Sequence, residues 1–297
     1  MNIRVLRYFL TIADLGTITG AARFLHVSQP TLSKQISDLE DELQVTLFER
    51  GHREITLTEE GRYLQTRAKE IIQLVDKTTY TLQTDHNLIG GELDIGAGES
   101  VGMERILKVV SGIQKDYPAV KIRLHSGDAA EVEHKLTAGL LDFGVIMGTR
   151  NLSQYETLKL PEADRWGLIL PKNDFLARKE VITPQDLIDR PIILSEQAFQ
   201  RQRFRNWWQG VDGEMNIVGT YNLLFNATLL VKNRSCYALA FENLIAAQQD
   251  EQLTFRPLKP ALTDPITLIW QNNGAPSSVA VLFLKRLKAN LADTSQA

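Results

Sequence analysis

Polar side chains gather at the start of one predicted helix near the N-terminus. Four of them carry amide, hydroxyl or ammonium groups within six consecutive positions: Gln29, Thr31, Ser33 and Lys34. Donors and acceptors of these kinds can pair with the edges of nucleic-acid bases and with phosphate oxygens. The other side of the same helix carries apolar residues in steps of four, three and four: Leu32, Ile36, Leu39 and Leu43. This pattern predicts a helix that is held by its apolar side and presents its polar side outward.

The residues around this helix predict two short helices joined by a tight turn. Thr17 or Thr19 can cap the first helix, and Ser28 can cap the second. Pro30 falls in the first turn of the second helix, where the missing N–H costs little. Farther along, a basic, Gly-containing tip from Arg50 to Arg53 separates two short strand-like runs. The segment therefore predicts a helix-turn-helix followed by a β-hairpin.

The runs LHVSQPTLSKQISDLEDEL, LFER and ITLTEEG resemble the DNA-binding domain of LysR-type transcriptional regulators, over residues 3 to about 62. The resemblance implies a winged helix-turn-helix over residues 1–58, whose second helix enters the major groove of double-stranded DNA. The residues expected to contact DNA are Thr17, Thr19, Ser28, Gln29, Pro30, Thr31, Ser33, Lys34, Arg50 and Arg53. The alternative is a small helical bundle whose polar face is only solvated, because helical hairpins also occur in proteins that never touch DNA.

The charge balance does not by itself indicate a DNA-binding protein. Residues 1–90 hold ten Lys and Arg against twelve Asp and Glu, a net charge of −2, and the whole chain carries −3. DNA-binding domains are usually basic. Any positive surface must therefore come from the placement of Lys34, Arg50 and Arg53, with the acidic run from Asp38 to Glu42 pointing away from the DNA.

Residues 59–89 predict one long helix with a repeated apolar pattern. Its positions alternate in steps of four and three: Leu64, Ala68, Ile71, Val75, Thr78 and Leu82. This pattern is typical of a helix that pairs with a second helix, and a helix lying on its own chain is the alternative. In the resembled family the segment is a linker helix that pairs two subunits. The resemblance thus implies a homodimer or homotetramer on a pseudo-palindromic operator.

Residues 90–297 alternate predicted strands and helices, which is typical of an α/β fold with largely parallel sheets. The resemblance implies an effector-binding domain of two α/β lobes, similar to periplasmic solute-binding proteins. The expected fold class is thus a multi-domain α+β chain. The expected lobes are residues 90–162 with 271–297, and residues 163–270, with crossover strands near Glu162–Leu170 and Thr263–Gln271.

Ligands of such sheets bind beyond the carboxyl ends of strands, where loops and helix N-termini meet. The candidate residues at these places are Ser100, Gly127, Asp128, Met147, Gly148, Ser195, Asn222 and Phe241. By the resemblance, most of them line a cleft for a small-molecule effector whose identity the sequence leaves open. Each can instead be an ordinary cap or turn residue. Asp128 in particular suits the N-cap of the helix that follows it.

Further helices are predicted near residues 184–189, 199–209, 223–233 and 277–291. The second of these carries Arg201, Arg203 and Arg205, which could favour an acidic effector. Because charges two positions apart spread around a helix, we expect them to form a solvated face instead.

A rival interpretation is a small-molecule-binding or hydrolytic protein. Residues 98–102 match the G-x-S-x-G turn that presents the nucleophile of α/β-hydrolases, here Ser100. In a hydrolase, an acid and then a histidine follow the nucleophile on later strands. Here the only histidines downstream are His125 and His134, and they follow Ser100 too closely to leave room for those strands. The five histidines show no metal-ligand spacing and Cys236 is the single cysteine, so we expect neither a metal site nor a cofactor.

Length and composition limit the remaining classes. A chain of 297 residues is expected to hold about two domains. No apolar run approaches the roughly 20 residues of a membrane helix, and the first residues do not follow the pattern of a secretory signal. The single cysteine excludes an intramolecular disulfide. We therefore expect a cytoplasmic regulator that binds double-stranded DNA, a small-molecule effector and further copies of itself, and no membrane.

Overall fold

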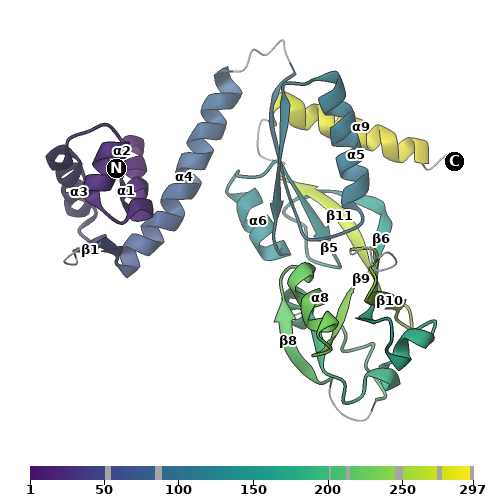
Figure 1. Ribbon diagram of the computed structural model, residues 1–297. Helices are drawn as coiled ribbons and strands as arrows, with labels where there is room; N and C mark the ends of the chain where they lie inside the picture. The colour runs from purple at the N-terminus through teal and green to yellow at the C-terminus, as the bar shows by residue number, and fades with distance from the viewer. Residues whose placement is uncertain are drawn as a thin grey trace. The chain divides into compact units, whose positions relative to one another are not determined.

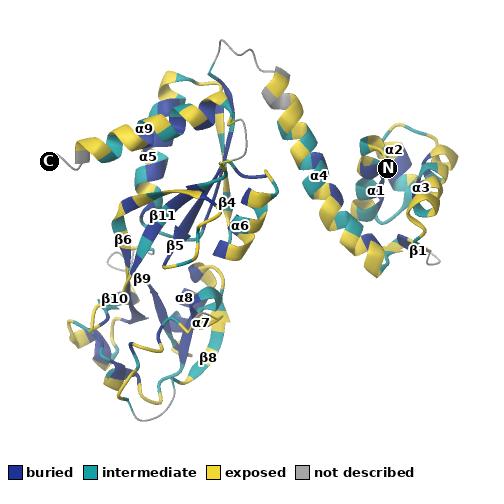
Figure 2. Ribbon diagram, turned by 180° about the vertical axis from the view of Figure 1, so that it is seen from behind, coloured by how far each residue is buried: buried dark blue, intermediate teal, exposed yellow. Residues whose placement is uncertain are grey.

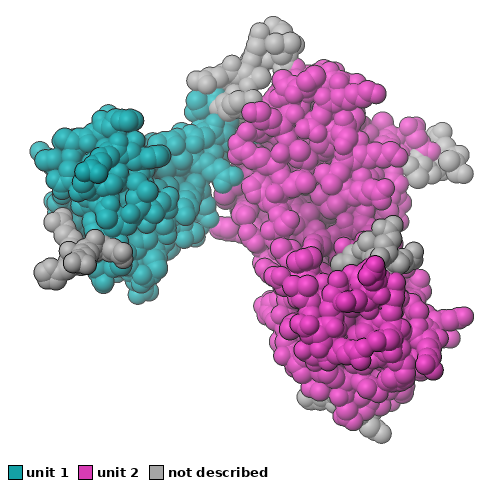
Figure 3. Space-filling model, viewed as in Figure 1, with its two compact units in different colours: residues 1–85 teal, residues 86–297 magenta. Residues whose placement is uncertain are grey.

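The computed structural model describes residues 1–50, 55–83, 89–200, 202–211, 215–244, 250–272 and 276–294. The chain forms two compact units, residues 1–85 and residues 86–297, which Figure 3 colours separately. Within the described residues, no helix is long and apolar enough to cross a membrane.

The first unit is a helical domain with a two-stranded hairpin (Figure 1). Its elements are α1 (Ile3–Leu15), α2 (Ile18–Phe24), α3 (Gln29–Leu43), β1 (Phe48–Arg50), β2 (Ile55–Leu57) and α4 (Glu59–Gln83). The first three helices begin at residues whose side chains accept a backbone N–H of the first turn: Asn2, Thr17 and Ser28. These bonds fix where each helix starts, because they satisfy N–H groups that have no partner inside the helix.

All four helices and the hairpin contribute to one core. Its buried side chains are Leu6, Phe9, Ile12, Ala21, Ala22, Leu32, Ile36, Leu39, Leu47, Phe48, Ala68 and Ile72. The apolar stripe predicted for α3 is confirmed at Leu32, Ile36 and Leu39. It is wrong at Leu43, which is 36% exposed. Leu43 is the last residue of α3, and the left-handed Gln44 (φ 56°) turns the chain away directly after it.

The helix α4 packs on its own unit along its first half. Ala68 and Ile72 are buried there, and Leu64 and Ile71 pack against the same core. Beyond them, Leu74 is 41% and Leu82 is 70% exposed. In Figure 2 the second half of α4 is drawn mainly in the colours of exposed and intermediate residues. The alternative of a helix lying on its own chain therefore holds for the first half of α4. The second half keeps apolar side chains exposed.

The second unit is built on a mixed sheet that runs through two lobes (Figure 1). Its strands are β3 (Gly91–Ala97), β4 (Val120–Ser126), β5 (Phe143–Met147), β6 (Glu156–Pro171), β7 (Ile192–Ser195), β8 (Ile217–Tyr221), β9 (Tyr237–Phe241), β10 (Leu253–Pro257) and β11 (Thr263–Trp270). They lie in the order β4-β3-β5-β11-β6-β9-β7-β8, and β10 pairs with β6. In the first lobe β3 pairs in parallel with β4 and β5, and in the second lobe β7 pairs in parallel with β8 and β9, as predicted. The pairs that involve β6, β10 or β11 are antiparallel.

The long strand β6 joins the lobes. Up to Arg165 it pairs with β11, and from Trp166 onward it pairs with β9. The crossover strands therefore lie near the two places where the sequence predicts them. They cross side by side as an antiparallel pair, so this pair of strands connects the two lobes.

Helices cover both lobes. The first lobe carries α5 (Met103–Asp116), α6 (Ala129–Thr137) and α9 (Ser278–Thr294), and the second carries α7 (Glu196–Gln200) and α8 (Leu224–Lys232), with single 3-10 turns at Phe175–Arg178 and Pro184–Leu187. The helix predicted over 199–209 is wrong. Among the described residues, α7 ends at Gln200, Gln202 has a φ of 49°, and turns continue to Gly210. Phe204 and Trp207 of this segment are nonetheless buried in the second lobe.

Candidate functional site

The polar end of α3 is held in place by its own cap. Ser28 Oγ accepts the backbone N–H of Thr31 at 3.3 Å and lies 2.7 Å from Thr31 Oγ1. Pro30 occupies the first turn, as predicted. These contacts engage the Ser28 and Thr31 hydroxyls with each other, so the side chains of Gln29 and Lys34 are the freer donors of this helix.

Exposure places most of the predicted residues on one accessible surface. Gln29, Pro30, Thr31 and Lys34 are exposed, and Ser33 is half-buried. The opposite face is buried in the core through Leu32, Ile36 and Leu39. On the neighbouring helix, Thr19 is exposed, whereas Thr17 caps α2 by accepting the Gly20 N–H at 3.2 Å. An α-helix with a polar exposed face of this width can enter the DNA major groove.

The turn between α2 and α3 is formed by His26 and Val27. His26 takes a left-handed conformation with φ 54°, which is uncommon outside glycine. Val27 then returns its N–H to the carbonyl of Ala22 at 3.0 Å and packs against the core. Ala21 and Ala22 are buried where the two helices meet, so their small side chains permit the close crossing that the sequence predicts.

The hairpin after α3 is fastened by an acidic residue. Glu40 Oε1 accepts the backbone N–H groups of Leu47 at 2.7 Å and Phe48 at 3.2 Å. Glu40 is therefore a structural member of the acidic run, whereas Asp38, Asp41 and Glu42 are exposed.

The basic tip of the hairpin is described only in part. Arg50 lies opposite Ile55 in the β1–β2 ladder. The side chain of Arg50 and the whole of Arg53 lie outside the described residues.

In the second unit, a cleft of about 330 Å³ lies between the two lobes. Seven of the eight predicted effector residues line it: Gly127, Asp128, Met147, Gly148, Ser195, Asn222 and Phe241. Asp128 also caps α6 by accepting the Glu131 N–H at 2.8 Å, so the cap and the cleft-lining interpretations are both correct for it. Ser100 does not line this cleft. It lines a neighbouring hollow beneath the start of α5.

Sequence reasoning missed several residues of the cleft wall. They are Thr149, Trp166, Gln197, Ala198, Arg203, Tyr221, Leu244 and Asp264. Thr149 adjoins the predicted Gly148, and the rule that ligands bind at strand ends could have found it. The same rule points to Gly98 and Glu99 beside Ser100 and to Glu196 beside Ser195, and these three residues also line the cleft. Arg203 and Asp264 could not be found in this way, because one comes from an irregular segment and the other from the crossover strand β11.

Two hydrogen bonds tie the lobes together at the cleft. Glu99 Oε2, from the first lobe, accepts the Leu224 N–H at the start of α8 at 2.7 Å. Gln197 Oε1, from the second lobe, accepts the Ala129 N–H at the start of α6 at 2.9 Å. Each lobe thus places a side-chain oxygen on a helix N-terminus of the other, where the free N–H groups and the helix dipole favour it. We call this pair of bonds the inter-lobe latch.

A charged cluster lies at the edge of the cleft. Arg203 Nε donates to Asp264 Oδ1 at 2.7 Å, and Trp166 Nε1 donates to Asp264 Oδ2 at 3.1 Å. Arg203 also donates to the carbonyl of Thr263 at 2.9 Å. The expectation of a solvated arginine is therefore wrong for Arg203, since a carboxylate distant in sequence holds it. Arg205 is exposed as expected, and Arg201 lies outside the described residues.

The residues of the hydrolase interpretation do not assemble into a triad. Ser100 Oγ accepts the Gly102 N–H at 3.0 Å, and His125 Nε2 pairs with Asp94 Oδ1 at 3.3 Å. In the part of the chain that the structure describes, no hydrogen bond joins Ser100 to a histidine, and no cluster of His, Cys, Asp or Glu is arranged to hold a metal ion.

Comparisons with known proteins cover both units. Residues 3–62 match the family described as "Bacterial regulatory helix-turn-helix protein, lysR family", and residues 86–292 match the "LysR substrate binding domain". The probable RuBisCO transcriptional regulator of Porphyra purpurea is 33% identical over 282 residues, which span 88% of this chain and 87% of that protein. The corresponding regulator of Synechocystis sp. is 35% identical over 184 residues, or 61% of this chain and 53% of that protein.

Among solved structures, CbnR, a LysR family transcriptional regulator, has the same fold. The similarity has a TM-score of 0.77 at 20% identity and covers 98% of this chain and 99% of CbnR. A structure of full-length CbnR with its target DNA gives a TM-score of 0.74 at 19% identity, covering 99% of both chains. At these identities the likeness shows the fold alone.

Proposed function

The chain belongs to the LysR family of transcriptional regulators, and from this premise we propose how its two units divide the work. The first unit binds DNA sequence-specifically through α3. The second binds a small molecule in the cleft between its lobes, and occupancy of the cleft changes the affinity for the operator or the bend imposed on it. The observation that carries the proposal is the exposed polar start of α3, opposite a face that is buried at Leu32, Ile36 and Leu39.

The contacts with DNA follow from the chemistry of the exposed side chains. Gln29 is suited to a bidentate contact with adenine, whose N6 and N7 offer one donor and one acceptor in the major groove. Thr31 and Ser33 can contact either base edges or phosphates, and Lys34 supplies a positive charge for a phosphate. Arg50 and Arg53, at the tip of the hairpin, are proposed to contact the adjacent backbone or minor groove. The acidic net charge is no obstacle, because Gln29, Thr31 and Lys34 are all exposed at the start of α3.

Self-association gives two such helices to one operator. The second half of α4 exposes Leu74 and Leu82, and α8 exposes Phe225 at 68% and Leu229 at 44%. Apolar helix faces of this kind are usually covered by another helix. A homodimer or homotetramer would bury them and would read two half-sites of a pseudo-palindrome.

The effector acts through the cleft and its latch. A ligand held between the lobes must contact both of them, and it can compete with Glu99 and Gln197 for the N-termini of α8 and α6. A ligand that binds one lobe arrangement better shifts the population toward that arrangement. Because the protein acts on genomic DNA in this account, we place it in the cytoplasm.

A direct test uses the purified full chain and the DNA immediately upstream of its own coding sequence. We expect a gel shift at moderate salt that survives an excess of random competitor DNA. A thermal-shift screen of metabolites, run with and without that fragment, then identifies the effector as a compound whose stabilisation depends on the DNA. If an excess of random competitor DNA abolishes the gel shift, the result would contradict sequence-specific binding.

A further inference from the structure

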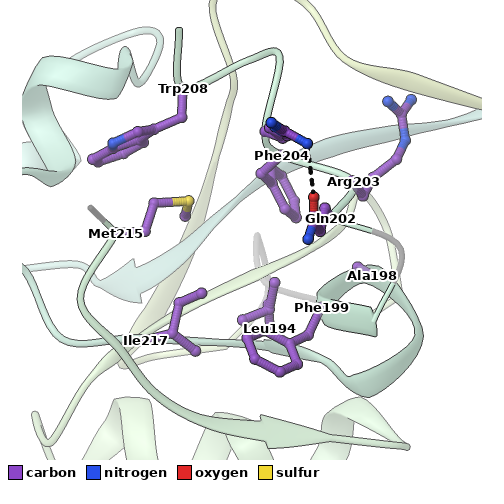
Figure 4. Close-up of a pocket in the computed structure, with 10 residues that line it drawn as sticks. Leu194, Ala198, Phe199, Gln202, Arg203, Phe204, Trp208, Met215 and Ile217 are labelled. Carbon is purple, nitrogen blue, oxygen red and sulfur yellow. Dashed lines mark hydrogen bonds between the residues drawn. The ribbon is translucent and has the colours of Figure 1, made fainter. Parts of the chain in front are cut away.

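A second hollow lies within the second lobe, next to the cleft (Figure 4). Its volume is about 440 Å³, against about 330 Å³ for the cleft. Most of its wall is apolar and comes from Leu194, Ala198, Phe199, Phe204, Trp208, Met215 and Ile217. Pockets that bind small molecules usually have volumes of roughly 300–1,000 Å³ and mainly apolar and aromatic walls. The hollow therefore has the size and the surface of a ligand site.

The irregular segment after α7 produces this hollow. The positive φ of Gln202 ends the helical course, and the turns that follow bury Phe204 and Trp207 in the lobe. Trp208 remains half-buried. Figure 4 shows Trp208 and Phe204 across an open space from Leu194 and Ile217. A continued helix would not place these rings in this way. The departure from the predicted helix is thus the feature that opens the hollow.

Two arginines border the hollow, and they differ in what they bind. Arg203 is held by Asp264 and by the carbonyl of Thr263, and Figure 4 shows its guanidinium pointing away from the apolar wall. Arg205 donates from Nη1 to Gln202 Oε1 at 3.3 Å. Among the described residues it has no carboxylate partner. An exposed guanidinium at the rim of an apolar hollow is a place for an anionic group.

We infer that this hollow binds a small carboxylic acid with a bulky apolar body. The body packs against Leu194, Ile217 and Trp208, and the carboxylate pairs with Arg205 at the rim. An apolar cavity of roughly 150 Å³ suffices for benzene, so a hollow of this size suits a fused two-ring acid or an alkyl acid of similar bulk. The site is distinct from the cleft, and the two share a wall of Ala198 and Arg203. Binding in the hollow does not rest on the proposed function of the cleft.

The test titrates 1-naphthoate into the full-length protein by calorimetry. Met215→Trp fills the hollow, and Arg205→Gln removes the charge at its rim. Thr149→Trp narrows the cleft instead, and Arg178→Gln removes an exposed arginine of the same lobe that does not line the hollow. Circular dichroism and thermal unfolding verify that each variant is folded, and Arg205→Gln changes only a surface side chain.

We expect one naphthoate per chain. Met215→Trp should weaken binding at least about tenfold and Arg205→Gln about fivefold, the latter because the ion pair is exposed. Thr149→Trp and Arg178→Gln should bind as the wild type does. Neutral 1-naphthalenemethanol should bind wild type and Arg205→Gln equally. Unchanged affinity in Met215→Trp, or loss of binding in Thr149→Trp, would overturn the inference. It would also be overturned if the wild-type protein binds no naphthoate and Met215→Trp changes only the oligomeric state.

Discussion

Asp164 and Asp264 lie directly opposite each other on the crossover strands β6 and β11. They are only 1% and 6% exposed. Asp264 is paired with Arg203 and with the indole N–H of Trp166. Asp164 Oδ1 accepts the Val101 N–H at 3.2 Å, whereas Oδ2 has no hydrogen-bond partner within the described part of the chain. The strand pair that joins the lobes thus carries one compensated and one poorly compensated carboxyl group.

This environment predicts a pH-dependent stability that Asp164 controls. Burial, aided by the charge of Asp264, raises the pKa of Asp164 to about 6, although the Ser100 hydroxyl and the Val101 N–H partly oppose the shift. The folded state then binds the proton more tightly than the unfolded state, so ionisation lowers the free energy of unfolding as the pH rises through about 6. The cost is absent below the ordinary carboxyl value of 3.8. It grows as the pH rises from that value to about 6, and above about 6 it is complete and amounts to about 3 kcal/mol.

Asp164→Asn should therefore raise the free energy of unfolding by roughly 1–3 kcal/mol at pH 7.5 and by much less at pH 4.5. All four tryptophans lie in the second unit, so urea unfolding followed by tryptophan fluorescence reports on it. Asp186→Asn is the control of opposite sign. Despite its partial burial, hydrogen bonds from Lys179 and Thr183 lower the pKa of Asp186, so this variant should lose stability at pH 7.5. Equal effects of Asp164→Asn at both pH values would contradict the assignment.

The inter-lobe latch predicts a local effect of Glu99→Ala. Removing the carboxylate leaves the Leu224 N–H of α8 without its acceptor. Hydrogen–deuterium exchange of peptides that begin at α8 should then accelerate about tenfold, since a bond to a charged group contributes about 1.5–3 kcal/mol. Glu133→Ala, which breaks a pair with Arg150 inside the first lobe, should leave α8 unchanged. An α8 exchange rate equal to the wild type in Glu99→Ala would exclude the latch.

Gln29→Ala tests base recognition by α3. Loss of a bidentate contact should reduce the preference for operator over random DNA by about 1–3 kcal/mol, mainly through weaker operator binding. Fluorescence anisotropy on both duplexes measures this difference. Gln65→Ala, on α4, is the matched control and should behave as wild type. If Gln29→Ala keeps the wild-type ratio, the side chain does not read a base.

Lys34→Gln tests contact with phosphate. The change should weaken binding to all sequences alike. In a homodimer it should also reduce the slope of log K against log salt by about two, because each of two lysines releases about 0.9 counterion. Lys69→Gln, an exposed lysine of α4, is the control for a general change in net charge. A slope that falls equally in both variants would remove Lys34 from the phosphate contacts.

The elements of the first unit could be predicted because the signals are local. Ser28 caps α3, Pro30 and the stripe from Leu32 to Leu39 lie within it, and capping and periodicity act over a few residues. The strand-end rule likewise found seven of the eight proposed effector positions in the cleft wall. Their roles in binding stay predictions.

The parts that escaped prediction depend on distant contacts. Arg203 and Asp264 are separated by 61 positions, and Glu99 and Leu224 by 125, so no pattern within a sequence window brings them together. The segment 199–209 has helical composition, but the left-handed Gln202 and the burial of Phe204 override that local preference. The position of Ser100 after a strand predicts a cleft residue, yet its hydroxyl accepts the Gly102 N–H.

Selection from a pool of randomised duplex DNA tests the central claim most directly. The full-length protein is the bait, at about 0.15 M salt, where non-specific phosphate contacts are screened. The account predicts enrichment of an inverted repeat whose half-sites lie about one helical turn, or a multiple of it, apart. Gln29→Ala should lose base preference at the same position in both half-sites. Enrichment of no motif, or the same motif in both proteins, would contradict the claim that α3 reads the operator.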